Sequence, residues 1–213
     1  MRRTLLAFAP LLVLAACSHA PAEYVVITTP GSKVAMAGWR RIATDSDRIR
    51  LSEWRTTFVA AIDQARRAGH GAEIDAEGAL LQPDSTIGGA LPNGLYKCRV
   101  IKVGAKAAGF LDYIAYSGFS CRVQPERGLQ GLAKLSGSQR PIGLIFPDSD
   151  NRSVFLGTLV LGDEPRAMQY GRDPDRDIAG WVERIGEGRW RLLVPEPRFE
   201  SKMDIYELTP AGE

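Results

Sequence analysis

The sequence predicts a mainly β protein of the α+β class, in which an antiparallel meander forms a closed or nearly closed, flattened barrel after a helical preface. Two observations carry this prediction. Residues 95–208 alternate short apolar runs with turn residues, and residues 44–82 repeat apolar side chains every three or four positions. A closed meander is favoured because it leaves no long strand edge exposed. The 213 residues suffice for one core of ordinary size.

The first 16 residues have the layout of a secretory signal peptide. Arg2 and Arg3 precede an apolar run over 5–16 that is too short to span a bilayer. The run closes with Leu14-Ala15-Ala16-Cys17, which resembles the bacterial lipobox, in which the cysteine sulfur receives a diacylglyceryl group. We expect cleavage after residue 16 and a mature chain that begins with a lipidated Cys17. Ordinary cleavage that leaves a spare Cys17 thiol is the alternative.

The lipobox resemblance also implies a location. Several acyl chains together anchor a protein stably to a membrane. Lipoproteins retained in the inner membrane typically carry an aspartate after the cysteine, whereas Ser18 stands here, which implies an outer-membrane protein that faces the periplasm. Loss of residues 1–16 removes two of 27 basic residues and no acid, so 25 basic and 25 acidic residues remain and the formal net charge falls from +2 to 0. A neutral body predicts no nucleic-acid partner.

Residues 17–38 are interpreted as the lipidated N-terminus and a tether, and residues 39–210 as a single domain. Pro21, Pro30 and Gly31 surround a short β-like run at 24–29. An added strand at this run is the alternative to a tether.

One long amphipathic helix is predicted to follow Thr44, which precedes Asp47 by three residues in a near match to a capping box. The apolar stripe contains Leu51, Trp54 and Phe58, which we expect to form core rather than a ligand platform. A shorter helical segment is predicted over 73–81, before a proline ends the helical preface at 82.

Nine short strands are predicted for the β region, separated by turn chemistry such as that of 147–151 and 186–188. They cover 95–103, 114–123, 129–135, 142–146, 154–161, 167–170, 180–185, 189–194 and 203–208.

Cys98 and Cys121 are expected to form a disulfide. If their strands form a hairpin centred near Gly109, the two cysteines face each other directly, at a Cα separation of about 4.5–5.5 Å that a disulfide tolerates. An even pair in an oxidising compartment fits this pairing. A redox-active pair is the alternative, but the spacing lacks the C-x-x-C pattern.

The sequence predicts no metal site, cofactor or catalytic residue. Its two histidines, His19 and His70, lack zinc-ligand spacing. The acidic run 148–151 reads as a turn, because the later ligands of a calcium loop are missing. No G-x-S-x-G nucleophile elbow occurs.

Two polar loops are the candidate binding sites. The first contributes Ser136, Ser138, Gln139 and Arg140, whose guanidinium could grip a carboxylate or phosphate. The second contributes Arg172, Asp173, Asp175, Arg176 and Asp177. Solvated loops with internal salt bridges are the plainer interpretation of both. If a general acid and base exist, they are sought first among the three aspartates.

Several motifs together resemble an uncharacterised bacterial envelope family, domain of unknown function four-eight-nine-three. The resemblance covers residues 39–210 and rests on Ile42-Ala43-Thr44, Asp47-Arg48, Trp54-Arg55, Tyr96-Lys97-Cys98-Arg99-Val100-Ile101-Lys102, Ser136-Gly137-Ser138-Gln139-Arg140-Pro141, Phe155-Leu156-Gly157-Thr158 and Phe199-Glu200-Ser201. It implies an exported setting and supplies no catalytic or binding residues.

The sequence therefore favours a non-catalytic envelope lipoprotein that binds a small amphipathic ligand or an envelope partner. The alternative is a hydrolase that acts on a cell-wall or lipid substrate through the loop carboxylates.

Overall fold

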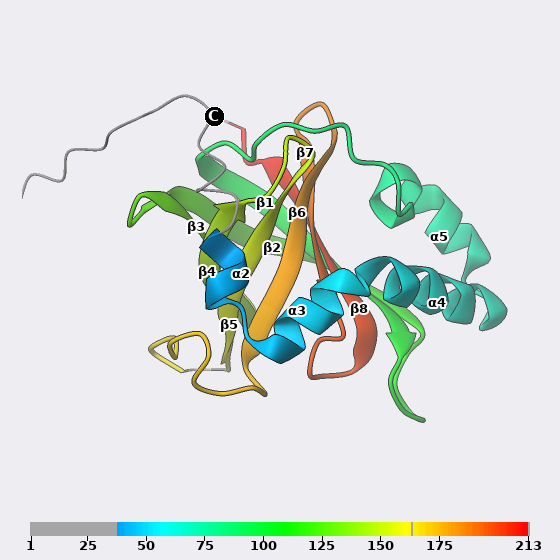
Figure 1. The fold of residues 1–213 in the computed structure, drawn as a ribbon. Coiled ribbons are helices and arrows are strands. Elements are labelled where there is room, and N and C mark those ends of the chain that lie inside the picture. Colours follow the sequence, from blue (N-terminus) through cyan, green and yellow to red (C-terminus); the bar gives the residue numbers. More distant parts are fainter. Residues whose placement is uncertain (1–37, 163, 213) are drawn as a thin grey trace, which may run out of the picture. The chain divides into compact units, whose positions relative to one another are not determined.

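The computed structural model describes residues 38–162 and 164–212 (Figure 1). These belong to one compact unit that spans residues 32–213. The predictions for the signal peptide, for Cys17 and for the run at 24–29 lie outside the described residues.

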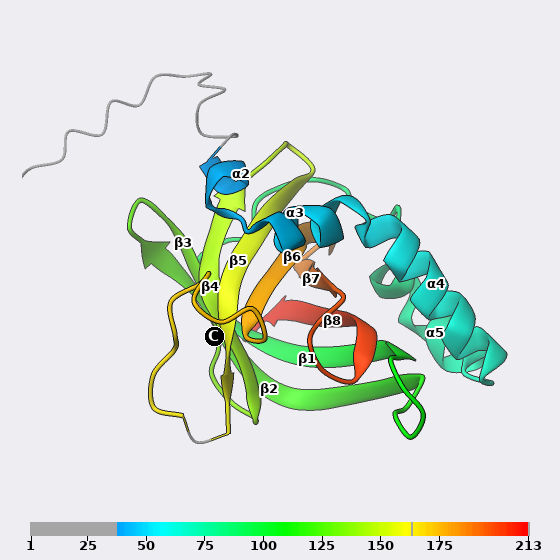
Figure 2. The ribbon, with the colours of Figure 1, turned by 60° about the horizontal axis from the view of Figure 1, so that its bottom comes forward.

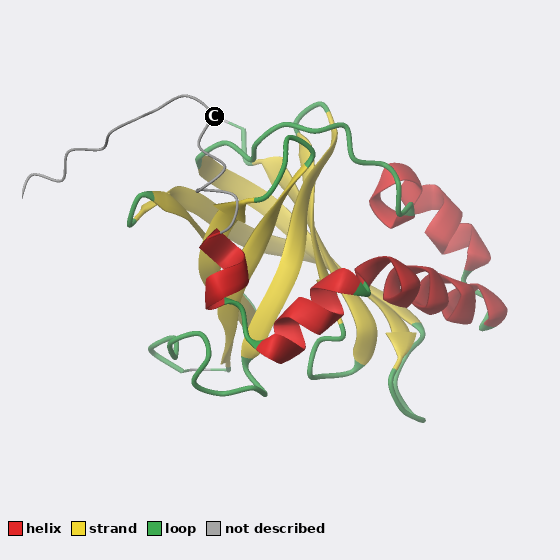
Figure 3. Cartoon of the chain, viewed as in Figure 1, coloured by secondary structure: helices red, strands yellow, loops and turns green. Residues whose placement is uncertain are grey.

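Eight antiparallel strands form a closed barrel in which each strand pairs with its neighbours in sequence and β1 pairs with β8 (Figures 1 and 3). The strands are β1 (Gly94–Ala105), β2 (Tyr113–Glu126), β3 (Leu129–Lys134), β4 (Gln139–Pro147), β5 (Arg152–Leu161), β6 (Asp177–Gly186), β7 (Arg189–Pro195) and β8 (Ser201–Pro210). The predicted mainly β meander and its closure into a barrel are confirmed.

The ninth predicted strand, at 167–170, is wrong. These residues lie in the connection between β5 and β6, which pair directly with each other and leave no place for a strand between them. Tyr170 instead contacts the helical preface, where its hydroxyl accepts a hydrogen bond from the Thr44 amide and donates one to the Asp47 carboxylate. Tyr170 therefore fixes the loop to the preface, whereas Ala167 and Met168 are exposed.

Within the described residues, the barrel is preceded by four helices and a 3-10 turn: α2 (Gly38–Ile42), α3 (Asp45–Ser52), α4 (Trp54–Arg67), α5 (Gly71–Glu77) and η1 (Gly78–Leu81). Thr44 caps α3, because its side chain accepts a hydrogen bond from the Asp47 amide. None of the described helices has both the length and the apolar character needed to cross a membrane.

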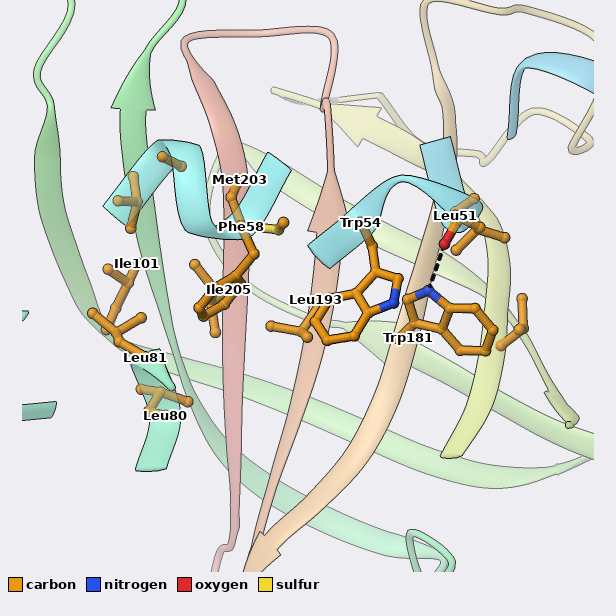
Figure 4. Close-up of a cluster of buried hydrophobic side chains, with 14 of the residues drawn as sticks. Leu51, Trp54, Phe58, Leu80, Leu81, Ile101, Trp181, Leu193, Met203 and Ile205 are labelled. Carbon is orange, nitrogen blue, oxygen red and sulfur yellow. Dashed lines mark hydrogen bonds between the residues drawn. The ribbon is translucent and has the colours of Figure 1, made fainter. Parts of the chain in front are cut away.

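The single long helix predicted after Thr44 is wrong, since α3 and α4 are separate helices that meet at Glu53. The Trp181 indole on β6 donates a 3.0 Å hydrogen bond to the Leu51 carbonyl at this junction (Figure 4). In a continuous helix, that carbonyl would accept from the amide of Arg55. The barrel thus provides a partner for the backbone where the helix breaks.

The helices lie along one outer flank of the barrel, where α3 contacts β6 and α4 contacts β1, β7 and β8 (Figure 2). Trp54 and Phe58 are both buried there, as predicted for core residues (Figure 4). The outward residues of the barrel beneath them include Ile101, Trp181, Leu193, Met203 and Ile205.

A second apolar cluster fills the barrel interior, because alternate residues of each strand point inward. The Phe155 ring packs against Gly157. A side chain at residue 157 would clash with it, because its Cβ would lie only 2.7 Å from the ring. The other large members are Tyr96, Trp190 and Tyr206. The middle of the barrel is therefore packed core, so a ligand inside the barrel would have to lie at one of its two ends.

The structure pairs Cys98 with Cys121 in a disulfide, as predicted, with a Cα separation of 6.0 Å. Their register differs from the prediction. Tyr96 stands opposite Cys121 and Cys98 opposite Phe119, so the bridge runs diagonally across the two strands. Between Cys98 and Val100 the register shifts by one residue, because Cys98 pairs with Phe119 and Val100 with Tyr116, and Gly118 of the longer β2 stretch has a φ of +81°.

Candidate functional site

The two ends of the barrel differ. At one end, the segment between η1 and β1 crosses the opening and places Leu91 in the interior cluster. Gln130 Nε2 donates a 2.8 Å hydrogen bond to the Leu91 carbonyl, and Trp190 Nε1 a 3.2 Å bond to that of Ala90. The chain therefore crosses and closes the barrel at this end, and a groove of about 540 Å³ lies outside it beside Leu91 and Ser149.

The opposite end, which Figure 2 turns toward the reader, carries a cavity of about 150 Å³ that we call the mouth cavity. Its polar lining comes from Lys102, Lys134, Ser138, Gln139 and Glu200. Its remaining lining residues are Val100, Tyr116, Phe119 and Tyr206. Charged and aromatic groups therefore share one small space, which is the arrangement that binds an amphipathic molecule.

Lys102 and Asp204 form a buried ion pair beside the mouth cavity. They are Cα partners across the β1–β8 seam, and Lys102 Nζ lies 3.0 Å from Asp204 Oδ2 and 3.3 Å from Glu200 Oε2. Burial favours a lower pKa for Lys102, but the two carboxylates outweigh it and hold the pKa of Lys102 above its ordinary value. Ser201 Oγ also donates to Asp204. The positive charge of Lys102 is thus locally compensated.

Lys134 is the second lysine of the mouth cavity, and its surroundings differ. Its Nζ donates to the carbonyls of Ser136 at 2.7 Å and Gln139 at 3.0 Å and lies 3.6 Å from the centre of the Phe119 ring. It forms no ion pair with any carboxylate within 38–162 or 164–212. Burial, with the nearby charges of Arg140 and Lys102, lowers the pKa of Lys134 to about 8.

A second cavity of about 430 Å³ adjoins the first, because Gln139 and Glu200 line both. We call it the outer cavity. Its apolar wall is Phe110, Leu161 and Phe199. An apolar chain that leaves the mouth cavity would meet this wall next.

The first predicted loop lies at this site. Ser138 and Gln139 line the mouth cavity. The Gln139 side chain connects Lys102 with Glu200, because it accepts a 3.1 Å hydrogen bond from Lys102 Nζ and donates a 3.4 Å hydrogen bond to the Glu200 carboxylate. Ser136 accepts a 3.1 Å hydrogen bond from the Ser120 amide through its hydroxyl. The Arg140 guanidinium donates hydrogen bonds to the carbonyls of Gly137, Gly162 and Glu164, so it connects its own loop to the segment that follows β5.

The charged side chains of the second predicted loop mainly form ion pairs and hydrogen bonds with other groups of the protein. Arg176 binds Glu164 in bidentate fashion at 2.8 and 2.9 Å, and Asp175 lies 2.7 Å from Arg198. Asp173 accepts from the Asp175 amide within a turn, and Arg172 is exposed. Asp177 is buried, accepts from the Gly171 amide at 2.9 Å, and has a pKa that burial raises. Asp175 and Asp177 do not line the mouth cavity, but they share with Asp204 a space of about 10 Å³ that adjoins it at Gln139 and Tyr206.

Of the residues that line the mouth cavity, the sequence analysis named only Ser138 and Gln139 as binding residues. It missed the other lining residues and Asp204 beside the cavity: Val100, Lys102, Tyr116, Phe119, Lys134, Glu200, Tyr206 and Asp204. A usable signal existed for two of them. Lys102 continues the inward-facing series Cys98 and Val100 of its strand, and Asp204 shares a face with Tyr206. A charge at an inward position of a barrel strand marks a place where the interior turns polar.

Comparison with known proteins adds the family and nothing about ligands. A family model described as "Domain of unknown function (DUF4893)" matches residues 39–208. No curated protein and no solved structure gives a match. Within residues 38–162 and 164–212, no group of three or more histidine, cysteine or acidic side chains is placed to hold a metal ion.

Proposed function

The chain belongs to the DUF4893 family, whose function is unknown, and we propose that its barrel binds a small amphipathic ligand at the mouth cavity. The observation that carries the proposal is the asymmetry of the barrel. Leu91 closes one end, whereas the other combines buried charges with aromatic side chains in one cavity. Mouths of β-barrels are common positions for small-molecule sites.

The size of the cavity sets the size of the ligand. An engineered apolar cavity of about 150 Å³ holds benzene, so the mouth cavity accommodates a headgroup with a few carbons. The outer cavity offers an apolar surface for a longer tail through Leu161 and Phe199. A single-chain amphiphile fits these two spaces better than a polymer does.

The contacts of the loop carboxylates favour binding over hydrolysis. A glycosidase-like pair needs two carboxyl groups that face one substrate across a cleft. Here Asp175 and Asp177 line a space with Asp204, but at about 10 Å³ it is too small for a substrate, and Asp175 pairs with Arg198. We therefore place the hydrolase reading second to the binding module.

We expect 1-octanol or octanoate to bind the purified protein in isothermal titration calorimetry, and Ser138→Trp to abolish that binding. Ser138 is exposed on the rim of the mouth cavity, so an indole there blocks the entrance with little effect on the fold. The matched control is Ser149→Trp, because Ser149 is also exposed but borders the groove at the closed end. The proposal fails if neither amphiphile binds, or if both tryptophan variants bind equally well.

The location of the protein is a second part of this proposal and rests on the lipobox-like sequence that ends at Cys17. We propose an outer-membrane lipoprotein whose barrel is tethered in the periplasm. In that setting, the ligand would come from the envelope.

Cys17→Ser is expected to leave an uncleaved precursor without lipid, whereas the native N-terminal peptide carries diacylglycerol and an acyl chain. Mass spectrometry of that peptide and membrane fractionation check this result. The fold is expected to persist, because the disulfide uses Cys98 and Cys121. Equal recovery of wild type and variant as processed, lipid-free periplasmic protein would contradict the anchor.

A further inference from the structure

The charge distribution of the mouth indicates what kind of headgroup it binds. Two carboxylates, Asp204 and Glu200, both contact Lys102. Lys134, which is only 6% exposed, has no carboxylate contact among the described residues. A buried ammonium without a counterion is electrostatically costly. One anion placed beside Lys134 would remove that cost.

The hydrogen bonds of Lys134 leave a place for this anion. An ammonium has three N–H donors, and two of them are used by the carbonyls of Ser136 and Gln139. The third has no oxygen or nitrogen acceptor among the described residues, and Nζ lies 3.6 Å from the centre of the Phe119 ring. The same side chain lines the mouth cavity beside Tyr116 and Phe119. The free donor and the apolar wall for a ligand's body therefore occur together.

We propose that the ligand of the mouth carries a single carboxylate, which the Lys134 ammonium binds inside the mouth cavity. This inference rests on the proposed binding function and specifies its ligand as an amphipathic monocarboxylate. The local charge fits one negative charge. The charged side chains that line the mouth cavity are Lys102, Lys134 and Glu200, and their charges sum to one positive unit.

A dianion or a cation fits this site less well. A dianionic headgroup would exceed the uncompensated charge and would approach Glu200, which borders the same cavity. A cationic headgroup would face Lys134 and Lys102 directly. A carboxylate also gains a charge-assisted hydrogen bond, which is stronger than a neutral one.

The pH dependence of binding follows from the ionisation of Lys134. Its pKa of about 8 means that it is mostly charged at pH 7 and mostly neutral at pH 9.5. The pKa of Lys102 is held above its ordinary value, and burial raises that of Tyr206 well above its own, so neither loses its proton over this range. The other charged or titratable side chains around the cavity are Tyr116, Arg140, Glu200 and Asp204. Carboxylate affinity should fall by about thirtyfold between these two pH values.

The test compares three eight-carbon probes that differ in the headgroup: octanoate, 1-octanol and octylamine. At pH 7, we expect octanoate to bind the purified protein about tenfold to a hundredfold more tightly than 1-octanol. Octylamine is expected to bind more weakly than either. Isothermal titration calorimetry measures all three, and it needs no substitution in the protein.

Lys134→Met is expected to remove the preference for octanoate and its pH dependence, while 1-octanol still binds. Lys134 has no carboxylate partner among the described residues, so this substitution leaves no buried carboxylate unpaired. The control is Lys97→Met, because Lys97 lies exposed on β1 and should leave the preference unchanged.

The outcomes separate this inference from the proposed function. If 1-octanol binds as tightly as octanoate at pH 7, or if Lys134→Met retains the preference, the carboxylate assignment is wrong but the binding module stands. If no probe binds, the proposed function fails as well. Preferential binding of octylamine would reverse the assigned charge of the ligand.

Discussion

Replacement of Arg191 by methionine is expected to lower the free energy of unfolding by about 3–5 kcal/mol, measured by denaturation in urea. Arg191 on β7 is 0% exposed, and its Nε and NH2 groups donate to Glu183 Oε2 at 2.9 and 2.7 Å. The remaining donors hold the preface to the barrel through the carbonyls of Ala79, Leu80, Gln82 and Pro83. The variant therefore loses the hydrogen bonds that attach η1 to the barrel. It also leaves the buried Glu183 carboxylate without the positive charge of Arg191.

Glu183 explains why the loss is large. It is 1% exposed, and its other oxygen has only a 3.4 Å ion pair with Arg152 and no hydrogen bond. The matched control is Arg55→Met, which breaks an exposed ion pair with Asp84 and should cost at most about 1 kcal/mol. The double variant Arg191→Met/Glu183→Met should be less destabilised than Arg191→Met alone. Equal losses for Arg191→Met and Arg55→Met would show that the buried pair does not hold the preface.

Removal of the disulfide is expected to cost about 3 kcal/mol, in the variant Cys98→Ala/Cys121→Ala and equally in the reduced wild type. The bridge closes a loop of 23 residues in sequence, and loop-closure entropy of this length gives that magnitude. Alanine is the chosen replacement because both sulfurs lie in the apolar interior, where a serine hydroxyl would lack a partner.

The disulfide also supports the candidate site. It joins β1 and β2, which carry Val100, Lys102, Tyr116 and Phe119 of the mouth cavity. We therefore expect weaker octanoate binding in the alanine variant even under conditions where it is folded. A reducing agent provides the control, since it should lower the midpoint of thermal unfolding of the wild type and leave the variant unchanged. An unchanged midpoint for reduced wild type would contradict the stabilising role.

The sequence predicted the barrel and its disulfide because both follow from local patterns. Alternating strands and turn residues are visible along the chain, and the two cysteines lie on consecutive strands. The break between α3 and α4 was not predictable in this way, because it involves Trp181, which lies 130 residues after Leu51. The register of the cysteines includes an irregularity opposite Gly118, which has a φ of +81°, and a glycine inside a strand is the local signal of such a bulge that the sequence analysis did not use.

The candidate site was predicted only in part, for a related reason. Ser138 and Gln139 were found because their loop is polar and flexible. Lys102 and Asp204 lie 102 residues apart and meet only when β8 closes on β1. Lys134 stands at the end of a short strand, where its burial depends on the carbonyls of the next turn. The site therefore forms only when the barrel closes, and local sequence patterns predict few of its residues.

The most direct test of the binding site is a crystal structure of the protein with octanoate. We predict that a carboxylate oxygen of octanoate lies about 2.7–3.2 Å from Lys134 Nζ. Its alkyl chain should pass Phe119 and reach the wall formed by Leu161 and Phe199. Octanoate bound only in the groove at the closed end beside Leu91, with the mouth cavity empty, would contradict it.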